Sequence, residues 1–454
     1  MPVVPSSLDA LLSLFRDGFN APTFATFRML VVGFLCRVGE HSVCGMLQAA
    51  RLERVWHHSR AHAFFAERKW YPDELGLLLL DFLVARFLAP GAPIRLAVDD
   101  SLFHRAGKKV YGAAWQYDGS VPQGAGRQSG YGNNWVSVCL IVRLPFMRRA
   151  VGLTILSRLW RPDPQASKNK GAKRKPNGDY PTKPELARQM LDLIIARFPD
   201  RVIELVGDSA YATKAFAGVS ARVSVTSRLK ANARSYAPAP PRTGKRGQPA
   251  KKGHRLPKLK QIADDPKTVW EQAEVTRSGK RQTVLCHTFE CLWYDVWGQR
   301  PVRVVLVKAT SRSEGYDVAL ITMDMHASVA EIIERYDERW AIEVSYEDAK
   351  QITGVGQARN RVQKAVERTV PFGFLCQTIA ITWYASLHGR VEHDVDHRRQ
   401  RSPWYLQKRF PSYQDMLSSL RRAVIAAQYL PVTPRRPTPQ QISRPVPALK
   451  TAAG

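Results

Sequence analysis

Several features that would indicate other classes of protein are missing from this sequence. It has no run of eighteen apolar residues, so it does not predict a membrane-spanning helix. Its six cysteines form no CxxC pair, so neither a zinc finger nor a redox motif is indicated. The first residues, Met1-Pro2-Val3-Val4-Pro5, are not a charged segment followed by an apolar one, so we expect no secretory signal. We therefore expect a cytoplasmic protein with reduced thiols.

Acidic residues are also scarce relative to basic ones. The chain of 454 residues has 68 Lys and Arg against 39 Asp and Glu, which gives a formal net charge of +29. An excess of this size predicts a polyanionic partner, most simply nucleic acid. With 44% hydrophobic residues the chain has enough apolar side chains for a sizeable core, and its length suggests two or three domains.

The N-terminal part, residues 1–90, is predicted to be helical. Apolar segments with helix-forming residues lie at 27–35 and 73–83, and a basic segment with aromatic residues lies between them at 51–60. This composition is typical of a small helical DNA-binding domain, but a plain helical cap on the next domain explains it equally well. The sequence Pro90-Gly91-Ala92-Pro93 then marks a boundary.

Residues 91–229 have the pattern of an α/β core. Strand-like runs cover residues 94–101, 135–142, 150–156, 202–211 and 222–229, with a helical stretch at 184–195. The first run ends in Asp99 and Asp100, and the fourth carries Asp208 at its end. Strands one and four can be neighbours in a mixed sheet, which would bring these carboxylates together.

The C-terminal half is predicted to hold an insertion and then the rest of the same core. Residues 230–312 have the pattern of a β-rich insertion with a Pro-rich basic loop at 237–260. Residues 313–390 would return to the core, with a helix that begins near Val329. Residues 391–454 are basic, and we predict that their end, 431–454, is disordered.

The predicted helix near residue 340 carries an unusual set of polar side chains. Tyr336, Arg339, Glu343 and Lys350 stand at i, i+3, i+7 and i+14, so they fall in one stripe of a regular α-helix. Taken alone, such a stripe is more often a solvated face with charge pairs. Glu347 lies on nearly the same stripe and is a competing acidic residue.

Three acidic positions could converge if this helix packs on the sheet. Asp100, Asp208 and Glu343 would then form a set of carboxylates, which bind hard divalent cations such as Mg²⁺ through oxygen. Two metal ions about 4 Å apart can clamp the attacking and leaving oxygens of an in-line phosphoryl displacement. The sequence therefore predicts metal-dependent chemistry on a phosphodiester.

The same residues carry a resemblance to a known family. The stretch from Tyr336 to Lys350 resembles the Tyr-(2)-Arg-(3)-Glu-(6)-Lys signature of DDE transposases from bacterial insertion sequences, the group that includes the transposon-five transposase. The start of the first acidic motif, Asp99-Asp100-Ser101, and the length look most like the insertion sequence seven-oh-one type. The resemblance covers about residues 94–360.

The resemblance implies a fold, a site and its ligands. The fold would be α/β and RNase H-like, a mixed sheet with helices that is interrupted by the β-rich insertion. Asp100, Asp208 and Glu343 would be the catalytic residues and would bind two Mg²⁺ or Mn²⁺ ions, with Asp100 preferred over Asp99 because of its place in the family motif. Tyr336, Arg339 and Lys350 would bind DNA phosphates. One of Trp270, Trp293 and Trp297 could stack on a flipped base, although each is more simply a packing residue.

The function implied is cut-and-paste transposition. The protein would cleave double-stranded DNA at transposon inverted-repeat ends and transfer the strand into target DNA, as a homodimer on DNA near the bacterial nucleoid. Two alternatives stay open. One is a sequence-specific DNA-binding protein derived from a transposase that does not cleave, and the other is a structure-selective nuclease without strand transfer.

Overall fold

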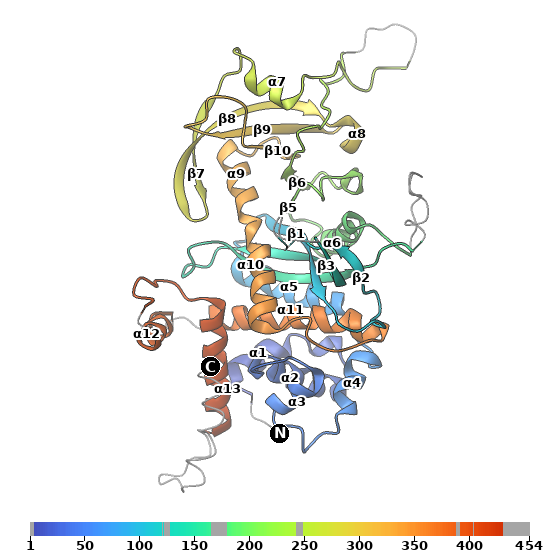
Figure 1. Cartoon of the computed structure of the whole chain (residues 1–454), viewed down its shortest axis with the longest axis vertical. Coiled ribbons are helices and arrows are strands. Elements are labelled where there is room, and N and C mark those ends of the chain that lie inside the picture. Colours follow the sequence, from blue (N-terminus) through green and yellow to red (C-terminus); the bar gives the residue numbers. More distant parts are fainter. Residues whose placement is uncertain are drawn as a thin grey trace.

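The computed structural model describes residues 4–119, 121, 128–164, 179–241, 248–386, 391–402 and 404–429. Part of the predicted basic loop at 237–260 and the predicted disordered end at 431–454 lie outside these residues. The described chain is a mixed α/β structure built on one long sheet, as Figure 1 shows.

Within the described residues the sheet has ten strands, and its central strands are parallel. The order is β2-β3-β1-β5-β6-β10-β9-β8-β7, with β4 also paired to β3. The strands are β1 (Ile94–His104), β2 (Ala114–Tyr117), β3 (Ser129–Val142), β4 (Val151–Trp160), β5 (Ile203–Gly207), β6 (Val223–Arg228), β7 (Glu271–Arg277), β8 (Lys280–Leu292), β9 (Pro301–Ala309) and β10 (Val318–Thr322). The pairs β1–β5 and β5–β6 are parallel, so the predicted neighbourhood of strands one and four is confirmed.

Both faces of the central strands are covered by helices. All five residues of β5 are buried, as expected for a parallel strand between two layers. The helices are α1 (Ser6–Ser13), α2 (Ala21–Cys36), α3 (Val43–Ala49), α4 (Ser59–Ala66), α5 (Pro72–Phe87), α6 (Lys183–Arg197), α7 (Leu259–Asp264), α8 (Tyr294–Trp297), α9 (Val329–Glu338), α10 (Trp340–Asp348), α11 (Gln363–Ser386), α12 (Val391–Arg401) and α13 (Tyr413–Tyr429). The helices α5, α10 and α11 pack on β4, and α6 packs on β3 and β4.

The N-terminal helices share a core with the long helix α11. Phe27, Phe64 and Phe65 surround Phe372 with ring centroids 6.1, 6.0 and 5.2 Å away. Within the described residues no single helix is long and apolar enough to cross a membrane, although α11 and α12, bent by 111°, pass that test together by length and composition. Because α11 is buried nearly throughout, it serves here as the central helix of this core.

The segment 230–312 extends the core sheet. Its last strand, β9, pairs antiparallel with β10, so β9, β8 and β7 continue the sheet beyond β6 and β10. Helix α9 packs on β7. In Figure 1 these strands lie at one end of the molecule and the N-terminal helices lie at the other, with α9 and α10 running between them.

Candidate active site

Helix α9, where the polar stripe begins, has a well-defined N-terminal cap. Ser328 caps α9, and its side chain and that of Glu331 exchange hydrogen bonds with each other's backbone N–H, which forms a capping box. The helix therefore begins at Val329, as predicted. Its buried Arg335 pairs with Glu204 of β5 at 2.8 Å and with Asp324 at 3.1 Å. These ion pairs hold α9 against β5 and against the residues that follow β10.

The aspartates at the ends of β1 and β5 approach each other because of the sheet register. Val98 of β1 is paired in parallel with Gly207 of β5. The next residue on each strand is an aspartate, Asp99 and Asp208, and side chains in register on parallel strands point to the same face. The charge of Asp208 raises the pKa of Asp99, which places the two carboxylates within electrostatic range.

Arg339 joins this edge of the sheet to Glu343. One end of its guanidinium lies 3.0 Å from Asp99 Oδ2, and the other lies 2.6 Å from Glu343 Oε1. The side chain of Arg339 is only 12% exposed, against 19% for Asp99 and 31% for Glu343. The arginine is thus enclosed between two carboxylates from different elements.

The protonation of Asp99 reflects opposing effects. Burial raises its pKa to about 7, and the charges of Asp208 and Asp100 act in the same direction. Arg339 and the N–H of Asp100, which donates to Asp99 Oδ1 at 2.8 Å, lower it. The pKa of Asp99 therefore stays near 7 even with the guanidinium of Arg339 beside it.

Asp100 faces the opposite side of β1 from Asp99. Its Oδ2 pairs with Lys183 Nζ of α6 at 2.5 Å, and its Oδ1 accepts a hydrogen bond from Tyr211 at 3.0 Å. The physical reason is the pleat of the strand, which alternates side chains between the faces. The structure does not bring the preferred residue Asp100 to Glu343; it brings Asp99 there.

Asp100 nevertheless contacts the turn that carries Asp208. The backbone N–H of Tyr211 donates to the Asp208 carbonyl at 3.0 Å, and the Tyr211 hydroxyl donates to Asp100. Asp208 Oδ1 itself accepts from the N–H of Ala210 at 2.8 Å. Asp100 therefore supports the Asp208 turn from behind the sheet.

Tyr336 lies beside Arg339, and Lys350 contacts the residue two positions after Asp99. The guanidinium of Arg339 stands 5.7 Å from the centre of the Tyr336 ring. Lys350 lies in a π-helical turn, Ala349–Thr353, and donates to the Ser101 hydroxyl at 2.7 Å. Burial lowers the pKa of Lys350, and Glu347 is exposed.

Tyr346 was not predicted from the sequence. Its hydroxyl donates to the Asp99 carbonyl at 2.8 Å, so it ties α10 directly to β1 beside the acids. Its side chain is 5% exposed. The only signal was its place in the helix, three residues after Glu343 and therefore on an adjacent part of the same side.

The three tryptophans of the insertion all have packing partners. Trp297 is buried and donates to the Thr213 carbonyl at 3.1 Å, and Trp293 packs edge-on against it at 5.0 Å. The ammonium group of Lys308 lies 4.1 Å from the centre of the Trp270 ring.

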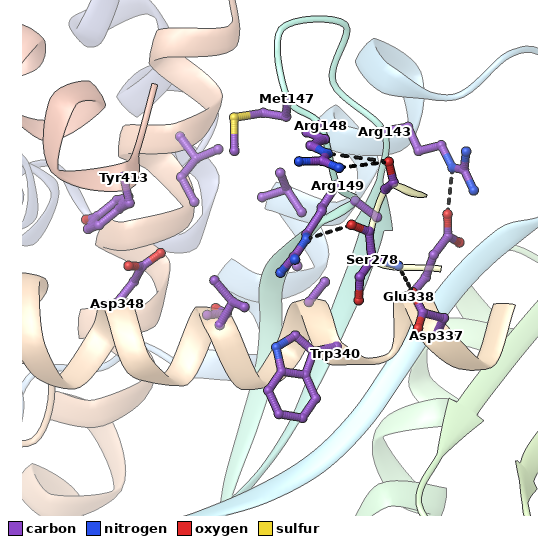
Figure 2. Close-up of a pocket in the computed structure, with 18 of the residues that line it drawn as sticks. Arg143, Met147, Arg148, Arg149, Ser278, Asp337, Glu338, Trp340, Asp348 and Tyr413 are labelled. Carbon is purple, nitrogen blue, oxygen red and sulfur yellow. Dashed lines mark hydrogen bonds and ion pairs between the residues drawn. The ribbon is translucent and has the colours of Figure 1, made fainter. Parts of the chain in front are cut away.

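A separate cavity of about 320 Å³ lies beside α10, and its described lining includes none of the three acids Asp99, Asp208 and Glu343. Figure 2 shows Arg148 and Arg149, from the β3–β4 connection, reaching the tip of the β7–β8 hairpin. Arg149 donates to the Ser278 carbonyl at 3.2 Å, and the Ser278 N–H donates to Asp337 at 2.6 Å. These contacts join the hairpin to the end of α9 along the wall of the cavity. The cavity is therefore distinct from the place where Asp99, Asp208 and Glu343 approach one another.

Comparison with family models shows which family the chain belongs to. A family model described as DDE superfamily endonuclease matches residues 14–290, more than half of the chain. The chain belongs to the DDE superfamily of endonucleases. The match includes Asp99, Asp100 and Asp208 of this DDE endonuclease and ends before Glu343. No match was found among curated proteins.

Membership of this family implies DNA as the substrate, and DDE superfamily nucleases generally use divalent metal ions. The chemistry of the acids in this DDE endonuclease fits such an ion, because carboxylate oxygens are the ligands that Mg²⁺ prefers. In the structure, the guanidinium of Arg339 occupies the space between Asp99 and Glu343. Among the described residues, no three or more His, Cys, Asp and Glu side chains converge tightly enough to hold a metal ion.

Proposed function

We propose that the protein is a transposase that cleaves DNA at the inverted-repeat ends of a mobile element and joins the freed strand to target DNA. The observation that supports this most is the approach of Asp99, Asp208 and Glu343 from three separate elements to one edge of the sheet. Family membership supports the nuclease step. The net charge of +29 supports a long contact with DNA.

In this proposal Asp99, Asp208 and Glu343 are the catalytic acids and would hold Mg²⁺ or Mn²⁺, two ions per site. Asp99 takes the place expected for Asp100, because Asp99 shares a face with Asp208 and pairs with the same arginine as Glu343. When bound, the ions would activate a water or a 3′-hydroxyl and stabilise the leaving oxygen. The fold would be the RNase H-like one implied by the sequence.

The cationic and phenolic side chains around the acids would hold the DNA backbone. Arg339 can bind a phosphate with two parallel hydrogen bonds, whereas Lys350 acts as a point charge. Tyr336 would donate through its hydroxyl. All three lie beside the acids, so a phosphate held by them would sit next to the reacting bond.

The remaining features of the proposal come from the resemblance of the Tyr336–Lys350 stretch to the signature of insertion-sequence transposases. Two transposon ends must be held together, so a homodimer on DNA is proposed. The seven-oh-one type is proposed as the type of transposase, from the Asp99-Asp100-Ser101 motif and the chain length. Its place of action would be the bacterial nucleoid, and no membrane partner is proposed. The helices α1 to α5 would contribute to binding the inverted repeats.

The test is cleavage and joining in vitro with DNA ends taken from the inverted repeats that flank the gene. The parent protein should nick these ends only with Mg²⁺ or Mn²⁺ and should form joined products with a target plasmid. Asp208→Asn and Glu343→Gln should bind the same DNA and cleave at least about 100-fold more slowly. Binding without cleavage by the parent would instead support the DNA-binding alternative, and cleavage without joining would support the nuclease.

A further inference from the structure

We propose that Arg339 closes the metal site in the DNA-free protein, and that a DNA phosphate draws Arg339 away so that divalent metal binds tightly only when DNA is present. This inference rests on the proposed function, because it takes Asp99 and Glu343 as metal ligands. It adds that DNA binding precedes tight metal binding at that site. Arg339 is then a residue that regulates the site as well as one that holds DNA.

The first reason is that the guanidinium and a metal ion would compete for the same oxygens. Arg339 contacts Asp99 Oδ2 at 3.0 Å and Glu343 Oε1 at 2.6 Å. A Mg²⁺ ion needs ligand oxygens at about 2.0–2.1 Å in near-octahedral geometry, so it cannot share this space with a guanidinium.

The second reason is electrostatic. Asp99 and Glu343 are two partly buried carboxylates, 19% and 31% exposed, that meet at one guanidinium, so the site favours a positive charge between them. In the DNA-free protein Arg339, at the junction of α9 and α10, supplies this charge. A divalent cation supplies more charge at the same place, so it can replace the arginine once another anion accepts the guanidinium.

The third reason is that Arg339 has unused capacity for a phosphate. Among the described residues its Nε has no hydrogen-bond partner although it is buried, while its two terminal nitrogens are engaged by the carboxylates. A DNA phosphate offers several acceptor oxygens in the geometry that a guanidinium prefers. Nearby Tyr336 and Lys350 would favour a phosphate there.

The experiment counts bound Mn²⁺ by electron paramagnetic resonance, with the full-length protein alone and on a duplex of the transposon end. We expect the parent to bind Mn²⁺ at least tenfold more tightly on DNA than alone. The Mn²⁺ bound by the complex of the Asp99→Asn/Glu343→Gln double variant with the same duplex is subtracted as background. Arg339→Gln should bind Mn²⁺ without DNA at least tenfold more tightly than the parent. Arg339→Lys, which keeps a charge but cannot span both carboxylates, should be intermediate.

Arg143→Gln is the matched control, because Arg143 pairs with Glu338 at 2.6 Å and not with the site acids. It should leave Mn²⁺ binding by the free protein unchanged. If neither Arg339 variant binds Mn²⁺ more tightly than the parent, the proposal is wrong. If Mn²⁺ binding on DNA is nevertheless lost in Asp99→Asn, the proposed function stands without the switch. If Arg339→Gln still binds Mn²⁺ more tightly than the parent when Asp99→Asn and Glu343→Gln are added to it, Asp99 and Glu343 are not the metal ligands and the ligand assignment is wrong.

Discussion

Asp99 and Asp100 are adjacent carboxylates with different surroundings. Asp99 points to Arg339 and the helix with Glu343, and Asp100 points to Lys183 and Tyr211 on the other face. One therefore belongs to the proposed metal site, and the other supports the turn that carries Asp208. The sequence alone could place both acids at the end of a strand. It could not show which face the Glu343 helix would cover.

The burial of Asp348 can be tested by the pH dependence of the protein's stability. Burial, with a smaller effect from the charge of Glu347, raises its pKa from 3.8 to about 7. Because the folded protein then binds this proton more tightly than the unfolded chain, the carboxylate destabilises the fold increasingly as the pH rises from about 4 towards 7. Above that range the cost is constant.

Asp348→Asn should therefore stabilise the DNA-free protein more at high pH than at low pH. We expect its advantage in the free energy of unfolding to grow by about 2 kcal/mol between pH 5.5 and 8.5, as measured by urea denaturation. Glu347→Gln, which changes the exposed neighbour, should show a much smaller effect. An equal effect of Asp348→Asn at both pH values would contradict the shifted pKa.

At the scale of elements, the position of α10 depends on close contact with β4. A Cβ atom on Gly152 of β4 would lie 2.7 Å from the carbonyl oxygen of Ala341 and 2.9 Å from its carbonyl carbon. Both are backbone atoms, which cannot rotate away as a side chain does. The glycine lets the helix with Glu343 lie directly on the sheet.

Gly152→Ala should push α10 outward and cost roughly 1–3 kcal/mol of stability, as other overpacked cores do. Metal-dependent cleavage should fall as well, because Glu343 moves with the helix. Gly119→Ala is the control, since among the described residues its Cβ would meet only the Tyr117 ring, at an ordinary 3.6 Å. Equal unfolding midpoints for the two variants in urea would show that the contact is looser than described.

Elements with a periodic apolar pattern were mostly predicted from the sequence, and short or irregular elements were not. The start of α9 near Val329 and the adjacency of β1 and β5 were predicted from the apolar patterns, whereas the capping box at Ser328 and the parallel direction of the pair were not. The short edge strand β2 has alternating exposed residues and no strong signal. The π-helical turn at Lys350 was not predicted, because it depends on tertiary contacts such as the one with Ser101. The regular stripe drawn through Lys350 is therefore only approximate.

At the scale of the whole molecule, the net charge of +29 should dominate binding to DNA. Each neutralised phosphate releases counterions, so affinity should fall by roughly 10³ or more between 50 and 200 mM salt if about six phosphates are contacted. Lys350→Gln should reduce the slope of log affinity against log salt by about one. Fluorescence anisotropy with a labelled duplex measures both. A flat response to salt would argue against DNA as the partner.

The most direct test of the proposed site compares two neighbouring substitutions in one cleavage assay. The parent, Asp99→Asn and Asp100→Asn are given the same transposon-end duplex and Mg²⁺, after equal DNA binding has been checked. Because Asp99 faces Glu343 and Asp100 faces away, Asp99→Asn should abolish nicking, whereas Asp100→Asn should retain a measurable part of it. Full loss in Asp100→Asn with activity kept in Asp99→Asn would contradict the assignment and restore Asp100 as the first acid of the site.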